Sequence, residues 1–303
     1  MRTHAIIVMT FRSKPPIVPD WQKNRLTVVD PAIWPIYRSP RCDLRLVYSD
    51  LLGAFRSLGV SCDILTKEDC PVDIWIRDWG PIENCYFDFC PSYAKGWYSV
   101  RSIAQARRYL DRRRAITPRR IPLVLDGGNL VHNGQIGIVT EKVWLDNPQL
   151  SKREVERGII SIGLEQVAVI PIEPSDTMGH ADGIVRFIDK GRLLVNDYER
   201  VEMFRGYGRR LRRRLEQQLP RVSLIPFPWF PTNDKIAGVW GARGSYINMV
   251  HTKGCLVYPT FDSPMDEEVA ALLRTLLCVP TRAIAANALA QLGGVLNCIV
   301  LPL

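Results

Sequence analysis

The chain has 303 residues, of which 47% are hydrophobic, 23% charged and 9% aromatic. These fractions are typical of globular proteins and exclude disordered, collagenous and coiled-coil chains. The formal net charge of +9 allows weak attraction to nucleic acid or to an acidic surface. No apolar run reaches the roughly 18 residues of a membrane-spanning helix. We therefore expect one globular domain over residues 1–303 that does not bind a membrane.

The amino-terminal half alternates predicted strands and helices. Residues 5–9 are apolar, but this stretch is too short for a signal peptide, so we expect a strand there and a cytoplasmic protein. Export by a specialised route stays open. Residues 43–58 carry apolar side chains at helical spacing and predict an amphipathic helix. Further strands are predicted at 62–65, 73–76, 121–125 and 136–140, with a helix at 102–114 and a hairpin turn at Asn133-Gly134.

The carboxy-terminal half continues the alternation. Ser151 and Glu154 form a capping box that opens a helix to about residue 163. A basic helix is predicted at 199–218, and Ser263-Pro264 opens another that runs to 277. Strands are predicted at 167–172 and 222–227, hairpins at 184–188 with 193–196 and at 246–250 with 255–258, a last helix at 284–292 and a last strand at 295–300.

Pairs of strands thus recur with helices between them, and no linker or change of composition divides the chain. This order predicts one α/β domain built from about five similar units, each a hairpin, a helix and a further strand. The positive charge is concentrated near residues 106–120 and 208–218. We expect these to be solvated helix faces. Nucleic-acid binding is the less favoured alternative, because no zinc finger, RNP or helix-turn-helix pattern accompanies them.

The eight cysteines and four histidines are scattered, and none of the cysteines form a CxxC pair. A zinc site needs clustered ligands at short spacing, so no metal site is predicted. Eight cysteines are too sparse for a disulfide scaffold in a chain of this length. We expect reduced thiols and no metal or organic cofactor.

Five polar or glycine-rich segments interrupt the apolar pattern at intervals of about 55 residues, roughly one per predicted unit. If the five turns converge on one axis, their side chains share a pocket. The segments are Trp75-Ile-Arg-Asp-Trp-Gly-Pro81, Asp126-Gly-Gly-Asn129, Gly179-His-Ala-Asp182, Gly244-Ser-Tyr-Ile-Asn248 and Gly293-Gly-Val-Leu-Asn-Cys298.

Such a pocket would hold a thiol, an imidazole and at least three carboxylates. Carboxylates at the ends of buried strands are costly unless they are solvated or paired, so a cationic ligand is expected. Two carboxylates can each grip one edge of a planar guanidinium, a thiol can attack its carbon, and a histidine can move the protons. Each residue alone has a simpler explanation: a core thiol, a capped turn or a surface ion pair. The order and spacing of the whole set favour the pocket.

These five motifs resemble those of the agmatine deiminases and the bacterial-type peptidylarginine deiminases, within the guanidine-modifying superfamily. Two further stretches, NPQLSKREVERGI and VYPTFDSPMDEEV, are also similar. The resemblance covers about residue 70 to the carboxy terminus. It implies an α/β fold in which five units form a propeller with pseudo-fivefold symmetry.

The resemblance also implies roles for individual residues. Cys298 matches the nucleophile, and His180 matches the general acid and base. Asp78 and Asp182 match the carboxylates that clamp the guanidinium. Asp126 lies where related enzymes carry an acidic residue that supports the histidine or the substrate. Further candidates for substrate binding are Trp75, Arg77, Asn129 and Asn248.

The chain departs from the agmatine deiminase pattern at several positions. Asn297 replaces a histidine beside the nucleophile, and Val300 replaces a threonine. The second motif begins with Asp126 where the agmatine enzymes usually carry glutamate, and their Trp-Gly-Gly segment has no clear counterpart. These differences affect the expected substrate more than the expected chemistry, because the motif cores are intact.

The implied reaction is hydrolytic deimination of a guanidino group through a covalent thiouronium on Cys298. An agmatine-type substrate is the first candidate, giving a carbamoyl product and ammonia in polyamine biosynthesis. An arginine side chain of a peptide or protein is the alternative, and the product would then be citrulline. Another guanidino compound, amidinotransferase chemistry and a catalytically inactive basic binding protein stay open, the last because of Asn297. The sequence leaves the oligomeric state undecided.

Overall fold

The computed structural model describes residues 17–33, 38–39, 42–69, 71–89, 100–114, 117–236 and 239–302. The strand predicted at 5–9 lies outside these residues. In the described part of the chain, the strands form several small sheets instead of one large sheet. No described helix is both long and apolar enough to span a bilayer.

Five parallel strand pairs make up most of the sheet structure in the described residues. Parallel strands need a long crossover connection, and here an α-helix supplies it each time. The pairs are β1 (Arg25–Val29) with β4 (Ser61–Leu65), β5 (Cys85–Asp88) with β6 (Arg119–Val124), β8 (Ile136–Thr140) with β9 (Gln166–Ile170), β11 (Arg192–Asn196) with β12 (Ser223–Phe227), and β16 (Leu256–Thr260) with β17 (Thr281–Ala285).

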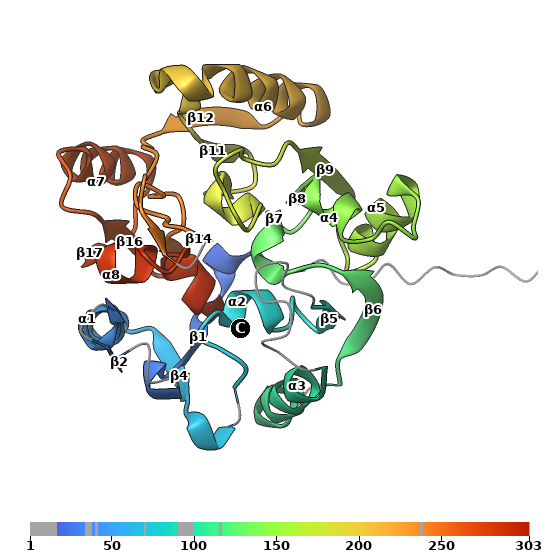
Figure 1. Cartoon of the computed structure of the whole chain (residues 1–303), viewed down its shortest axis with the longest axis vertical. Helices are drawn as coiled ribbons and strands as arrows, with labels where there is room; N and C mark the ends of the chain where they lie inside the picture. The colour runs from blue at the N-terminus through green and yellow to red at the C-terminus, as the bar shows by residue number, and fades with distance from the viewer. Residues whose placement is uncertain are drawn as a thin grey trace, which may run out of the picture.

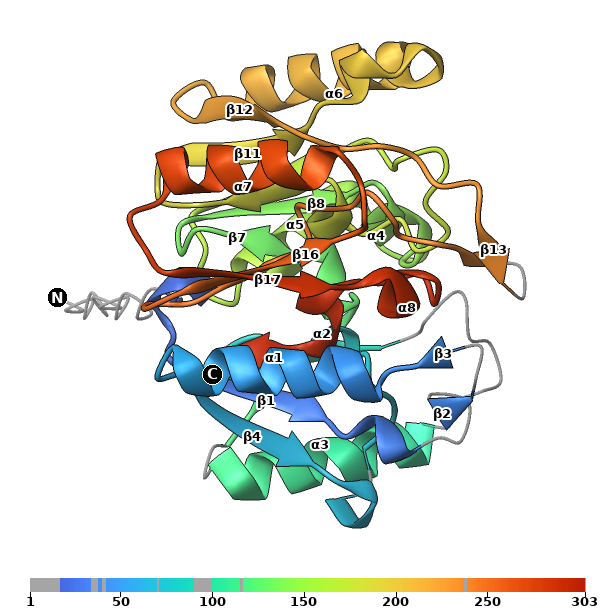
Figure 2. The same cartoon turned by 90° about the vertical axis from the view of Figure 1, so that its left-hand side faces the viewer.

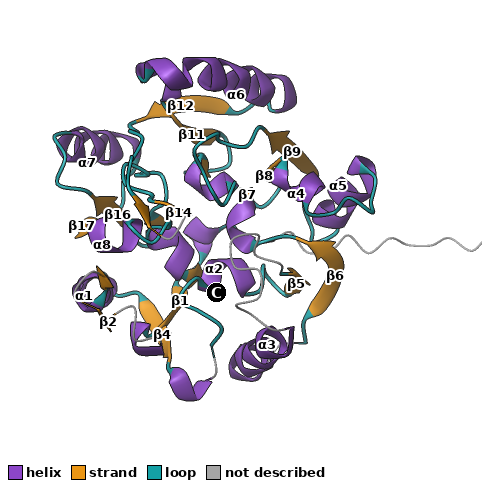
Figure 3. Ribbon diagram, viewed as in Figure 1, coloured by secondary structure: helices purple, strands orange, loops and turns teal. Residues whose placement is uncertain are grey.

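The crossover helices lie on the outside of the molecule, around the strands (Figure 1). Figure 3 shows the strands between these helices and the short helices at the centre. In side view, α6, α7 and α1 lie one above another (Figure 2). The crossover helices are α1 (Arg45–Ser57), α3 (Val100–Arg114), α5 (Lys152–Ile160), α6 (Arg205–Gln218) and α7 (Met265–Leu276).

A short antiparallel strand extends four of the pairs. β18 is the last strand of the described chain and pairs with β1, the first of the five pairs, so the carboxy-terminal segment returns to the start of the fold. These strands are β18 (Leu301–Pro302) on β1, β7 (Val131–His132) on β8, β10 (Val185–Phe187) on β11, and β15 (Val250–His251) on β16.

Smaller elements complete the described chain. Two hairpins consist of β2 (Arg38–Ser39) with β3 (Cys42–Asp43), and β13 (Lys235–Ile236) with β14 (Val239–Trp240). The short helices are α2 (Ile76–Trp79), α4 (Lys142–Leu145) and α8 (Asn287–Ala290). Three 3-10 turns matter for the site: η5 (Gly127–Asn129), η6 (Ala181–Gly183) and η9 (Leu296–Ile299).

The amphipathic helices follow the sequence pattern. α1 buries Val47, Tyr48, Leu51, Ala54 and Phe55 on one face, as the helical spacing predicts. The capping box is present, since the Ser151 hydroxyl accepts from the Glu154 amide and the Glu154 carboxylate accepts from the Ser151 amide. In α6, the apolar face is buried and most of the arginines are exposed, as expected for a solvated basic face. This helix begins at Arg205, because 3-10 turns occupy 198–200 and 202–204.

Two predicted strands are turns instead. Residues 73–75 are irregular and residue 76 begins α2, because the Asp73 carboxylate accepts from the Ile74 amide and the Trp79 indole donates to the Asp73 carbonyl. Such local bonds compete with strand pairing. Only residue 250 of the strand predicted at 246–250 is extended, as the amides of Tyr246 and Asn248 bond back within a turn.

The carboxy-terminal prediction was also wrong in detail. The helix predicted at 284–292 is divided: residues 281–285 pair with β16, and only 287–290 are helical. The strand predicted at 295–300 is the turn η9, in which the Cys298 amide donates to the Val295 carbonyl. Short apolar runs fit a strand or a buried turn equally well, and tertiary contacts decide between them.

Candidate active site

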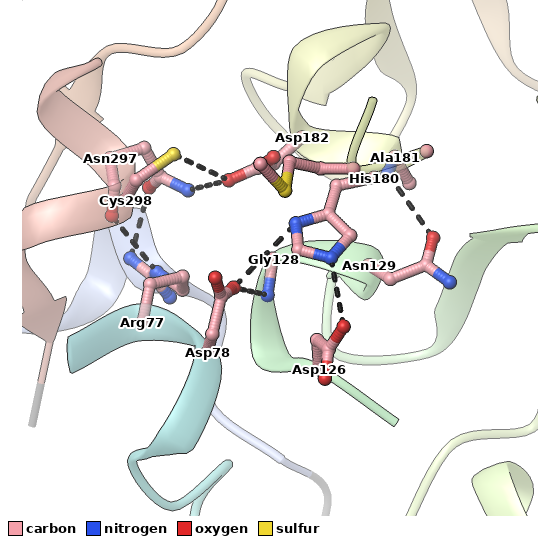
Figure 4. Close-up of polar contacts among 12 residues, drawn as sticks. Arg77, Asp78, Asp126, Gly128, Asn129, His180, Ala181, Asp182, Asn297 and Cys298 are labelled. Carbon is pink, nitrogen blue, oxygen red and sulfur yellow. Dashed lines mark hydrogen bonds and ion pairs between the residues drawn. The ribbon is translucent and has the colours of Figure 1, made fainter. Parts of the chain in front are cut away.

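Four turns and one short helix meet at the centre of the fold, and they carry the five sequence motifs. α2 contacts both η5 and η9, and η5 contacts η6. The Asn297 amide donates to Asn248 Oδ1, so the motif at 244–248 joins the same cluster, although about 220 residues of chain separate the first motif from the last. Figure 4 shows polar contacts among residues of the other four motifs.

Asp78 on α2 is buried, and its Oδ1 atom accepts a hydrogen bond of 3.0 Å from the Gly128 amide. The motif requires glycine here. A Cβ atom on Gly128 would lie 2.7 Å from Asp78 Oδ1 and 2.8 Å from His180 Nδ1. The glycine thus lets the backbone of η5 approach the two side chains closely enough to orient the carboxylate.

His180 lies between two carboxylates. Its Nε2 is 3.1 Å from Asp126 Oδ2, and its Nδ1 is 3.6 Å from Asp78 Oδ1. Asp126 is almost fully buried and also accepts from Lys142 Nζ at 3.1 Å. The imidazole is held by one carboxylate from behind and faces a second.

Asn297 connects the Asp182 carboxylate to two arginines. Its Nδ2 donates to Asp182 Oδ2 at 2.7 Å, and its Oδ1 accepts from Arg77 Nη2 at 2.9 Å and from Arg186 Nη2 at 2.8 Å. All three bonds fix the amide in one orientation. The backbone amide of Asn297 also donates to Asn248 Oδ1, at 3.0 Å.

The Cys298 thiol lies next to Asn297 on η9. Its Sγ is 3.4 Å from Asn248 Oδ1 and 3.9 Å from Asp182 Oδ2. Figure 4 shows Cys298 and His180 on opposite sides of Asp182, with Asp78 below them.

Several of these residues line a cavity of about 250 Å³. A volume of this size suits a small organic molecule more than an ion. Aromatic side chains form part of its wall, among them Trp229, Phe230 and Trp240. The motif residues that line it are Trp75, Asp78, His180, Asp182, Ser245, Asn248, Gly293, Gly294, Val295 and Cys298.

Burial and the neighbouring charges shift the pKa values of the titratable groups in this cluster. Burial opposes the protonation of His180, but Asp78 and Asp126 outweigh it and raise the pKa of the imidazole to about 9. Burial raises the pKa of Asp78 to about 7, against the opposing effect of His180 and with support from Asp126 and Asp182. Burial, Asp182 and Asp78 raise the pKa of the Cys298 thiol well above its usual value. Without substrate, the site therefore holds an imidazolium and a neutral thiol.

Comparison with known proteins identifies the family. The model of the Porphyromonas-type peptidyl-arginine deiminase family matches residues 45–302. The chain belongs to this family. The agmatine deiminase of Ectopseudomonas mendocina is 26% identical over 274 residues, which cover 75% of this chain and 73% of that protein. The agmatine deiminase of Pseudomonas aeruginosa strain LESB58 is 25% identical over 281 residues, which cover 75% of this chain and 73% of that protein.

The fold agrees with that of solved deiminase structures. The agmatine deiminase of C. jejuni with substrate bound superimposes with a TM-score of 0.73 over 95% of both chains, at 18% identity. The agmatine deiminase of Enterococcus faecalis gives 0.72 over 95% of both chains, at 15% identity. The deiminase-family chain thus has the α/β fold of the guanidine-modifying enzymes.

The structure divides the residues predicted for the deiminase site into two groups. Cys298, His180, Asp78, Asp182, Trp75 and Asn248 line the large cavity. The others lie behind it. Asp126 holds His180, and Arg77 contacts Asn297. Asn129 Oδ1 accepts from the amides of Thr140 and Ala181 and so anchors η6 instead of facing the cavity.

Sequence reasoning missed three contributors to the site. Lys142 neutralises Asp126 but lies outside the five motifs. Arg186 lies four residues after Asp182, inside a predicted strand, so nothing marked it as part of the site. The aromatic wall from 229–240 carried no motif, although three tryptophan or phenylalanine residues within twelve positions were a visible signal.

Proposed function

We propose that this chain catalyses the hydrolytic deimination of a guanidino compound, with Cys298 as nucleophile. The observation that carries the proposal is the presence of a thiol, an imidazole and two clamp carboxylates on one cavity of substrate size. Membership of the deiminase family supports it.

Asp78 and Asp182 would hold the guanidinium by charge-assisted hydrogen bonds to its two edges. The bound cation neutralises the two carboxylates that oppose ionisation of Cys298. It therefore lowers the pKa of the thiol, whose proton is released to water. The thiolate then attacks the central carbon of the substrate.

His180 would supply the proton for the first half of the reaction. As an imidazolium it donates to the departing nitrogen, and ammonia leaves a thiouronium on Cys298. Asp126 keeps the imidazole oriented and stabilises its charged form.

The second half would use the same histidine as a base. Neutral His180 accepts a proton from water, which adds to the thiouronium carbon. The C–S bond then breaks, the hydroxyl proton of the adduct passes through solvent to the departing sulfur, and the ureido product leaves Cys298 as a neutral thiol. The ammonia takes up the proton that the thiol released, so the sequence consumes one water and yields an ammonium ion.

An agmatine-type substrate is the first candidate. Five carboxylates line the cavity, and a substrate that carries a second cation is favoured where negative charge dominates. The relatives named agmatine deiminase support this choice. The lining carboxylates belong to Asp73, Asp78, Glu173, Asp176 and Asp182.

An arginine residue of a peptide is the second candidate, and Arg243 favours it. This guanidinium lines the cavity, and its Nε has no hydrogen-bond partner among the described residues. Asp234 balances it only from 3.8 Å. It could receive the carboxylate of a carboxy-terminal arginine.

The geometry at Asn297 argues against the catalytically inactive alternative. The replacement of a histidine by Asn297 was the main feature in favour of an inactive pocket. The Asn297 side chain does not line the large cavity, and it holds Asp182 in place. The substitution therefore removes no group from the cavity itself.

Ammonia release by the purified protein tests the proposal. We expect turnover of agmatine, slower turnover of a peptide ending in arginine, and none with Cys298→Ala. Arg243→Gln should abolish only the peptide activity, if that activity is present. The absence of ammonia release from agmatine, free arginine and the peptide would overturn the proposed reaction.

We further propose that the five units form a closed propeller with pseudo-fivefold symmetry, as one domain over residues 1–303. The five parallel pairs with outer helices and the pairing of β18 with β1 support this arrangement. We also propose a cytoplasmic location. The cysteines for which the structure describes the side chain are free thiols, which suits a reducing compartment.

A further inference from the structure

A second, smaller cavity lies behind the clamp carboxylate. Its volume is about 40 Å³, enough for one small ion or two to three water molecules. Asp182 lines both cavities, and Asn297 and Arg77 line only the second. The two cavities are thus separated by the residues that position the clamp.

Charged side chains of both signs line this second cavity. Lys23, Arg77 and Arg186 line it together with the carboxylates of Asp20 and Asp182, and Lys23 and Arg77 each have a carboxylate within ion-pair distance. Lys23 Nζ lies 2.8 Å from Glu83 Oε1, and Arg77 Nη1 lies 3.2 Å from Asp20 Oδ2.

Arg186 is the exception. Among the described residues no carboxylate oxygen lies within ion-pair distance of it, and its Nη2 donates to the neutral oxygens of Met249 and Asn297. The residue is 6% exposed. Asp20 and Asp182 offset part of its charge from a longer distance. A buried cation without a carboxylate in contact still carries a desolvation cost of several kcal/mol.

Three nitrogen atoms on residues lining this cavity have no hydrogen-bond partner among the described residues. They are Arg186 Nε, His132 Nδ1 and His251 Nδ1. Buried polar atoms are nearly always paired in folded proteins, so three unpaired nitrogens around one cavity indicate a missing partner. Arg186 Nε can only donate, and the Nδ1 atom of a neutral histidine donates in one of its two tautomers.

We propose that the second cavity binds one monovalent anion of chloride size, with Arg186 as its counterion and His132 and His251 as hydrogen-bond donors. Water could accept from the same nitrogens, but it would place no negative charge within ion-pair distance of Arg186. A chloride ion supplies both the charge and the acceptor, and it is little larger than a water molecule. Burial lowers the pKa of both histidines to about 4, so each is neutral near pH 7 and has one N–H to donate.

The anion would be coupled to the guanidinium site. Asn297 joins Arg186 to Asp182, so an anion beside Arg186 and a cation beside Asp182 influence each other through two hydrogen bonds. By linkage, each ligand should change the affinity for the other by the same factor. Binding itself does not require catalysis, so this proposal stands or falls separately from the proposed deimination.

A bromide-substituted crystal of the full-length wild-type protein tests the site directly. The protein would be crystallised from gluconate buffer and soaked in sodium bromide. We expect one anomalous peak within hydrogen-bond distance of Arg186 Nε. Ordered water without an anomalous peak in the cavity would overturn the proposal.

Chloride NMR linewidths test the same site in solution. In gluconate buffer of constant ionic strength, we expect a saturable excess linewidth that bromide removes by competition. His251→Phe should weaken chloride binding at least threefold while retaining a ring against Trp21, on which His251 stacks. Arg186→Met should abolish binding. Arg192→Met, which removes a half-exposed arginine elsewhere, is the matched control and should bind normally. A linewidth that rises without saturation, or that is unchanged in both cavity variants, would contradict the proposal.

Discussion

At the scale of single residues, two nearby carboxylates control the reactivity of Cys298. Burial raises the pKa of the thiol, and Asp182 and Asp78 raise it further, so the thiol should react slowly with alkylating agents when the site is empty. Asp78→Asn removes one of the two negative charges. We expect it to accelerate iodoacetamide labelling of Cys298 roughly tenfold at pH 8, which corresponds to about one pKa unit.

Peptide mass spectrometry would follow the labelling of each cysteine separately. Cys278 is exposed and serves as the internal control, because its labelling rate should not change. An unchanged or slower rate for Cys298 in Asp78→Asn would show that the carboxylate does not suppress the thiolate.

Asn297 should contribute to catalysis through Asp182. Asn297→Ala removes the bond to the Asp182 carboxylate and leaves the Arg77 and Arg186 donors without their shared acceptor. A hydrogen bond to a charged group contributes about 1.5–3 kcal/mol, so kcat/KM for the guanidino substrate should fall roughly 10- to 100-fold. Steady-state kinetics would measure the change. A kcat/KM equal to that of the wild type would exclude this role.

At the scale of elements, the close packing of η5 against α2 and His180 determines the geometry of the site. Gly128→Ala would place a Cβ within 3 Å of both Asp78 and His180. We expect the turn to shift and kcat/KM to fall more than 100-fold, since small displacements of catalytic groups have effects of this size. Gly206→Ala in α6 is the control. It meets no atom within 4 Å and should leave the activity unchanged. Equal activity of the two variants would contradict the close-packing account.

The outer elements were more predictable than the inner ones. α1, α3, α5, α6 and α7 carry apolar residues at helical spacing, and their limits fell close to the prediction except at the start of α6. The central segments failed because side-chain and backbone bonds override short apolar runs there. Asp73 turns the chain before α2, and Asn248 accepts from the Asn297 amide in η9.

The sequence motifs predicted which residues meet at the site, but not the hydrogen bonds that join them. The recurrence of polar segments brought Asp78, His180, Asp182 and Cys298 to one cavity, as the order of the motifs indicated. The assignment of Arg77 and Asn129 to substrate binding rested on their positions within two of the motifs. Their side chains point to Asn297 and Thr140 instead, and sequence spacing cannot show such long-range pairings.

At the scale of the whole molecule, the charges of the site affect stability. His180 has a pKa of about 9 in the fold, above its usual 6.5. Its protonated form therefore stabilises the fold below pH 6.5, and this contribution is lost as the pH rises toward 9. The pKa of Asp78 is about 7 in the fold, above its usual 3.8. Its contribution to the stability of the fold is therefore lost as the pH rises from 3.8 to about 7.

Urea unfolding between pH 6.5 and 9.5 would measure this effect. We expect the free energy of unfolding to fall across that range in the wild type and to fall less in His180→Gln. Parallel pH profiles for the two proteins would show that the imidazolium does not stabilise the fold.

The most direct test of the account is the mass of the protein during turnover. Wild-type protein mixed with agmatine and quenched in acid within milliseconds should carry an adduct equal to the substrate less ammonia. Peptide mapping should place that adduct on Cys298, and Cys298→Ala should show neither adduct nor ammonia release. Ammonia release that persists in Cys298→Ala, with no adduct in the wild type, would contradict the covalent mechanism.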